Sequence, residues 1–84
     1  MASKHQAKVK KKYENEGWIV INTIKLSVSG YPDLFCFKDG KTIFIECKEG
    51  GDTLKPLQKF RIDELIKQGF EAFCLHDTKG KIYP

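Results

Sequence analysis

Apolar residues in this chain fall into short runs that are separated by glycines, prolines and charged side chains. Two of these runs, residues 33–38 (DLFCFK) and 41–48 (KTIFIECK), are rich in aromatic and β-branched residues, and only Asp39 and Gly40 lie between them. An Asp-Gly pair between two such runs is typical of a two-residue hairpin turn. The pattern therefore predicts a β-hairpin near the middle of the chain.

The register of this hairpin follows from its turn. With two turn residues, Phe35 faces Phe44 and Asp33 faces Glu46, with Cβ atoms about 4.5–5.5 Å apart. Lys48 lies two residues beyond Glu46 and returns to the same face, because side chains alternate along a strand. Both faces also carry large apolar side chains, so we expect a central sheet that is covered on each side.

The rest of the chain supplies the cover and further strands. A proline suits the first turn of a helix and a glycine its end. The chain-order prediction is a basic helix capped by Ser3 and ending at Gly17, a strand over 18–24 buried on both faces, the hairpin, a helix from Pro56 to Gln68, a strand over 71–76 and a short last strand over 81–83. The order α-β-β-β-α-β predicts an α/β fold, a mixed β-sheet flanked by two helices.

Composition limits the classes of protein. The 84 residues leave room for one domain, 1–84, with a small core, and 40% hydrophobic content favours a folded chain over disorder. The three cysteines form no CxxC pair and are interpreted as core residues in a reducing compartment. No apolar run approaches the roughly 20 residues of a membrane span, and no signal-peptide core is seen. We expect an intracellular protein without a membrane partner, with His5 and His76 as surface or strand-end residues.

The opposed acids carry the candidate chemistry. Two facing carboxylates repel each other unless a cation lies between them, and hard oxygen ligands suit Mg²⁺. Lys48 beside them can position an attacking water or neutralise charge on a phosphate. The alternative is a pair of solvated acids and a lysine at strand ends.

Three segments, taken together, resemble a known family. They are GYPDLFCF, IECKEG and LKPLQKFRIDELIKQG, in this order between residues 30 and 69. The chain is similar here to the VRR-NUC (virus-type replication-repair nuclease) domain of the PD-(D/E)xK nuclease superfamily. The resemblance implies a small restriction-endonuclease-like core and a stand-alone, phage-type endonuclease.

The resemblance also assigns roles. It implies a hydrolase that cleaves DNA phosphodiester bonds with Mg²⁺ or Mn²⁺. Asp33, Glu46 and the backbone carbonyl of Cys47 are the expected metal ligands, and Lys48 is the expected catalytic lysine. Gln58 matches the family's motif glutamine, and either orients water or phosphate or simply caps its helix.

One family feature is missing. The family usually has a metal-binding glutamate on the first helix, and upstream of Gln6 this sequence has only small or basic residues, Ala2 to His5. Glu14 and Glu16 lie at the far end of that helix. A missing third acid is expected to weaken metal binding.

Charge indicates the partner. The net charge is +4, and Lys8, Lys10, Lys11 and Lys12 cluster on the first helix, where they either track a phosphate backbone or form a solvated face. Gly30 allows either a close phosphate approach or a turn. A chain this small predicts a homodimer with two active sites. The resemblance to the VRR-NUC family implies branched DNA, such as a Holliday junction, as the substrate, and a phage or mobile-element protein in the cytoplasm of a bacterial host. The alternatives are a DNA-binding module without catalysis and a small interaction protein whose acidic residues lie on the surface and have no catalytic role.

Overall fold

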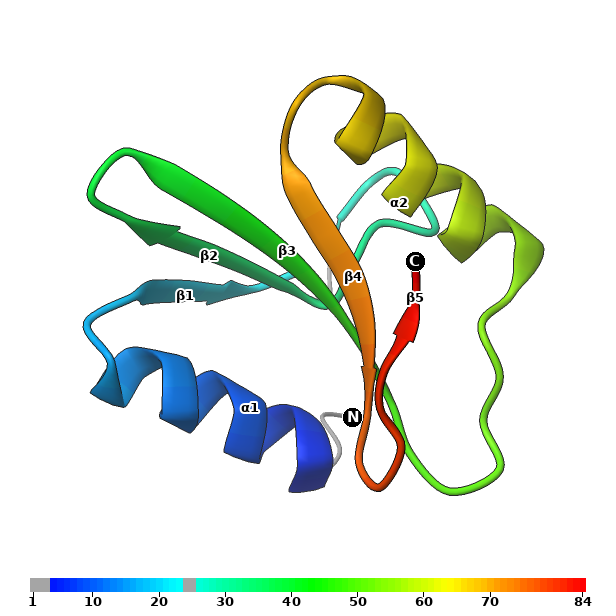
Figure 1. The fold of residues 1–84 in the computed structure, drawn as a ribbon, viewed down its shortest axis with the longest axis horizontal. Coiled ribbons are helices and arrows are strands. Elements are labelled where there is room, and N and C mark those ends of the chain that lie inside the picture. Colours follow the sequence, from blue (N-terminus) through cyan, green and yellow to red (C-terminus); the bar gives the residue numbers. More distant parts are fainter. Residues whose placement is uncertain (1–3, 24–25) are drawn as a thin grey trace.

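A five-stranded sheet lies between two helices in the computed structural model, which describes residues 4–23 and 26–84 (Figure 1). The strands follow one another across the sheet in chain order, and β3 and β4 are parallel while the other neighbours are antiparallel. The predicted α/β class is confirmed. The elements are α1 (Lys4–Asn15), β1 (Ile19–Asn22), β2 (Leu34–Lys38), β3 (Lys41–Lys48), α2 (Pro56–Lys67), β4 (Glu71–His76) and β5 (Gly80–Tyr83).

The β2–β3 hairpin has the predicted register. Phe35 pairs with Phe44, and the two rings meet edge to face at 4.7 Å between centroids. Asp39 and Gly40 both have positive φ, +50° and +76°, as a twist-matched two-residue turn requires. The ladder ends at the pair Leu34–Ile45, so Asp33 and Glu46 lie one step beyond it.

Each face of the sheet has its own core, because side chains alternate along the strands. The side under α1 holds Val9, Val20, Leu34, Cys36, Ile45 and Phe73, and the side under α2 holds Phe44, Ile62, Ala72 and Cys74. Alternation from Phe44 places Glu46 and Lys48 on the α2 side as well. The two acids and the lysine therefore share the sheet face with α2.

The prediction that the first strand is buried on both faces is wrong. Val20 is buried, but Ile19 and Ile21 are 67% and 50% exposed. They lie opposite Phe37 and Phe35, and hence on the α2 side. Since α2 packs on β4 and β1 is the far edge strand, that helix does not reach them.

The ends of two predicted elements, Ser3 and Ile24, lie outside the described residues. Neither α1 nor α2, the helices of the part of the chain that the structure describes, is long and apolar enough to cross a membrane.

Candidate active site

Asp33 is held in place by both neighbouring strands. The backbone N–H of Thr23 donates to the Asp33 carbonyl at 2.9 Å, and the Thr23 hydroxyl donates to the Pro32 carbonyl at 2.6 Å. On the other side, the Cys47 N–H donates to Oδ2 of Asp33 at 2.9 Å. The first acid is therefore fixed beside the strand that carries the second.

Glu46 and Lys48 are a buried pair on β3. They are only 3% and 8% exposed, and Nζ of Lys48 lies 3.6 Å from Oε2 of Glu46. Burial raises the pKa of Glu46 to about 8, and the negative charge of Asp33 acts in the same direction, while Lys48 opposes both. The charged form of the Glu46 carboxyl is therefore disfavoured in this position.

A hard divalent cation fits this donor set. Asp33 and Glu46 offer carboxylate oxygens, and the carbonyl of Cys47 lies between Glu46 and Lys48 along β3. Within residues 4–23 and 26–84 no cluster of three or more His, Cys, Asp or Glu side chains is placed to hold a metal. Mg²⁺ tolerates such a site, since it commonly keeps several waters and takes one or two carboxylates plus substrate phosphate.

Comparison with known proteins identifies the domain. The family model described as the VRR-NUC domain matches residues 3–78, which is most of the chain. The chain belongs to the VRR-NUC family. A solved structure titled "VRR_NUC domain" superposes with a TM-score of 0.73 at 27% identity, covering 87% of this chain and 84% of that one. No curated protein matches the chain.

VRR-NUC is a nuclease family, which generally uses divalent metals and whose substrate is DNA. The three residues Asp33, Glu46 and Lys48 that carry the PD-(D/E)xK pattern are brought together at one end of the hairpin. The sequence predicts this grouping, and the catalytic and metal-binding roles of the three residues stay a prediction.

Glu14, in the last turn of α1, and Glu16, just after this helix, lie away from the candidate site. Nζ of Lys38, at the turn end of the hairpin, donates to the Glu16 carbonyl at 2.6 Å, whereas Asp33 and Glu46 lie at the opposite end. The start of α1 is nearer: the His5 ring bonds the Leu75 carbonyl at 2.9 Å, and Leu75 is the ladder neighbour of Cys47.

Gln58 and Gly30 both serve the packing of α2. The Gln58 amide oxygen accepts the Lys55 N–H at 2.9 Å, which caps the helix. Gly30 has φ of +88°, and a Cβ there would come within 2.6 Å of Leu57 Cγ, so helix packing accounts for the glycine.

The loop before Asp33 is also tied to α2 by residues that the sequence did not reveal. The Tyr31 hydroxyl donates to Glu64 at 2.7 Å, and the Arg61 guanidinium lies 4.6 Å from the centre of the Tyr31 ring. Nε of Arg61 also donates to the Ser29 carbonyl at 3.2 Å. These contacts join α2 to the segment that presents the first acid.

The basic residues of α1 are on the other face of the sheet from the acids. Lys8, Lys11 and Lys12 are exposed, while Lys10 pairs with Glu14 at 3.1 Å. The structure therefore does not bring these lysines together with the acids, and their contact with DNA stays a prediction.

His76 also makes contacts that the sequence does not reveal. The sequence predicts a surface or strand-end residue. His76 is the last residue of β4, but it is buried, with only 4% of its surface exposed. It pairs with Lys48 in the parallel ladder, and its ring bonds the carbonyl of Gly50, 26 residues earlier. Nothing local in the sequence signals a partner so distant.

Proposed function

We propose that this VRR-NUC chain is a DNA endonuclease that depends on Mg²⁺ or Mn²⁺ and cuts branched DNA, such as a Holliday junction, as a homodimer. The observation that supports it best is the grouping of Asp33, Glu46 and Lys48 at the open end of the hairpin. The raised pKa of Glu46 adds support, because a bound cation offsets the charge that burial disfavours.

Each residue then has a role. Asp33, Glu46 and the Cys47 carbonyl hold the ion, which when bound lowers the pKa of a water and offsets charge on phosphate oxygens. The Lys48 ammonium, kept in place by burial and by Glu46, orients the nucleophile or stabilises the charge that grows on the phosphate. Gln58 offers its amide N–H groups to water or phosphate, since its oxygen is used by the helix cap.

We place the partner chain on the exposed apolar surface at the β1 edge. Ile19 and Ile21 are joined there by Leu26 and Val28, which are 46% and 49% exposed. Beside them lies a groove of about 320 Å³ lined mostly by apolar side chains. An apolar surface of this kind at a sheet edge favours self-association, and two-fold pairing presents two sites to a symmetric junction.

The dimer is tested by size and light scattering. Ile21→Glu is expected to give a monomer, while Ile82→Glu, at the β5 edge and also exposed at 38%, keeps the dimer. A monomeric wild type, or a dimer that survives Ile21→Glu, removes this part of the proposal.

The activity is tested with a labelled four-way junction, a matched duplex and a single strand, with Mg²⁺, Mn²⁺ or EDTA. We expect paired nicks in the junction that need metal and that vanish in Asp33→Asn and Lys48→Ala. Equal cutting of all three substrates removes the junction preference. We also propose that the protein works in the cytoplasm of a bacterial host of a phage or mobile element. Its three free thiols support a reducing compartment but do not bear on the host.

A DNA-binding module without catalysis is the second candidate. It is favoured by the small number of acidic ligands found in the described residues. Tight binding without any cutting, unchanged in both variants and independent of metal, is the result that selects it.

A further inference from the structure

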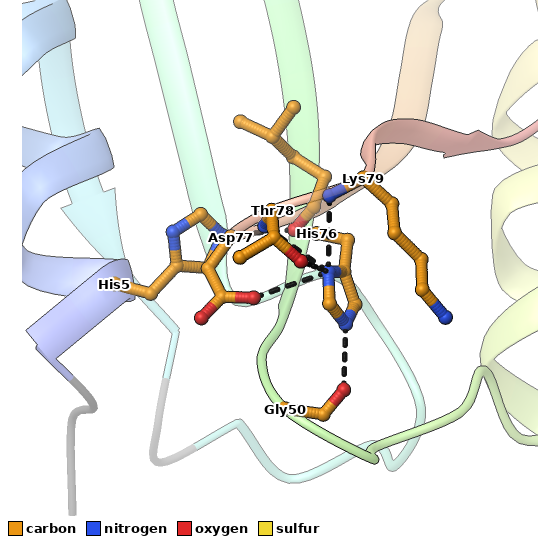
Figure 2. A network of polar contacts seen from close by, with 7 residues as sticks. His5, Gly50, His76, Asp77, Thr78 and Lys79 are labelled. Atoms are coloured by element: carbon orange, nitrogen blue, oxygen red, sulfur yellow. Dashed lines mark hydrogen bonds and ion pairs between the residues drawn. The ribbon is translucent and has the colours of Figure 1, made fainter.

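The His76 ring connects two separate segments beyond the strand ends (Figure 2). Its Nδ1 accepts the backbone N–H groups of Thr78 at 3.2 Å and Lys79 at 3.3 Å. Its Nε2 lies 2.8 Å from the carbonyl of Gly50, in the loop that follows β3. The imidazole therefore lies between the turn after β4 and the loop after β3.

The contacts decide which nitrogen carries the proton. Backbone N–H groups can only donate, so Nδ1 is the acceptor and the neutral ring carries its hydrogen on Nε2. Nε2–H then donates to the Gly50 carbonyl. In the charged ring Nδ1 also carries a hydrogen, which faces the Asp77 carboxylate at 3.1 Å, and Nε2–H still donates to Gly50. The bond to Gly50 is present in either form.

This bond acts on the segment that leaves Lys48. A first tie is made by the Asp77 N–H, which donates to the Lys48 carbonyl at 3.0 Å. The chain then runs through Gly50 and Gly51, whose backbones are the least restricted of any residue. The His76 bond holds this segment two residues after Lys48, and the same loop leads to the cap of α2 at Lys55 and Gln58.

We propose that His76 is a positioning residue: by holding the Gly50 carbonyl, it fixes the end of β3 that carries Lys48 and the Cys47 carbonyl. This inference rests on the proposed nuclease function. Its chemistry is specific, since what the site needs from His76 is a donor at the position of Nε2. An acceptor at the position of Nδ1 serves only the turn after β4.

Two matched variants separate these bonds. His76→Gln places an amide nitrogen near the position of Nε2 and keeps the donor to Gly50, whereas His76→Asn places an oxygen near the position of Nδ1 and keeps only the turn. We expect His76→Asn to lower kcat on the four-way junction by about 10–100-fold with little change in KM. We expect His76→Gln to stay within about threefold of the wild type.

A second measurement does not need activity. Backbone NMR order parameters for residues 49–53 should fall in His76→Asn and stay near the wild-type values in His76→Gln. Unchanged order parameters in His76→Asn overturn the proposal, and so does an equal loss of kcat in both variants. If the wild type cuts no DNA, the nuclease function fails by itself, and the order parameters alone decide whether His76 fixes the loop.

Discussion

The Asp33 carboxylate accepts the backbone N–H of Cys47, so the first acid of the site is bonded to the strand that carries the second. Asp33→Asn keeps an oxygen that can accept this bond, whereas Asp33→Ala does not. We expect Asp33→Ala to lose about 1–2 kcal/mol of unfolding free energy in urea and Asp33→Asn less than about 1 kcal/mol.

If the proposed function is right, both Asp33 variants lose junction cleavage by at least about 100-fold, because both remove the charge that we propose to bind the metal. Cleavage by Asp33→Asn at the wild-type rate would show that Asp33 serves structure alone.

Glu46 gives the metal-free protein a pH-dependent stability. Burial raises its pKa from 4.5 to about 8. Between these values the folded state binds more protons than the unfolded state, so the contribution of Glu46 to stability is present at low pH and is lost as the pH rises through this window. We expect the Tm difference between about pH 5 and pH 8, measured by calorimetry with EDTA, to shrink in Glu46→Gln.

Adding Mg²⁺ should stabilise the wild type more than Glu46→Gln. An ion that binds only the folded state raises Tm, and at about pH 8 it should do so in the wild type and much less in Glu46→Gln. An equal Mg²⁺ response in both proteins contradicts the assignment of Glu46 as a ligand.

Gly30 tests how α2 seats the loop before Asp33. Gly30→Ala combines a strained positive φ with a 2.6 Å clash against Leu57, so we expect a loss of about 2–3 kcal/mol. Adding Leu57→Ala removes the clash but not the strain, and should restore part of the loss. A double-mutant cycle in urea measures this coupling, and strictly additive effects exclude the clash.

The three thiols should be unreactive in the folded protein. Burial raises the pKa of Cys36 and of Cys74 to about 11, and it raises the pKa of Cys47 as well. Since the thiolate is the reactive form, we expect very slow reaction with Ellman's reagent at about pH 8 and full reaction in denaturant. Cys36 and Cys74 are buried and Cys47 is partly buried, so rapid reaction of all three thiols in the native protein contradicts this prediction.

What the sequence predicted well is what local rules control. The Asp39-Gly40 turn sets which residues of the hairpin face each other, and this was enough to bring Asp33, Glu46 and Lys48 to one face. The burial of Ile19 and Ile21 depends instead on where α2 lies, far along the chain. The apolar pattern of a strand does not reveal whether a helix covers that strand or leaves it exposed.

The same limit applies to the polar contacts. The bonds from Tyr31 to Glu64 and from His76 to Gly50 join residues 33 and 26 positions apart. Each partner is an ordinary surface residue by composition. Only the fold shows that the two residues of each pair are hydrogen-bonded to each other.

Strand order equal to chain order also has a kinetic consequence. Every strand pairs with its neighbours in sequence, but the pairings differ in how local they are: the β2–β3 hairpin closes over a two-residue turn, whereas the parallel β3–β4 pair closes over α2. Local pairings form faster than non-local ones. A hairpin forms in roughly 1–10 μs, so β2 and β3 can pair before α2 and β4 are in place. Asp33 and Glu46 then repel each other during the first step of assembly. The rate of folding should therefore rise in Asp33→Asn and in Glu46→Gln, whichever way the final stability changes.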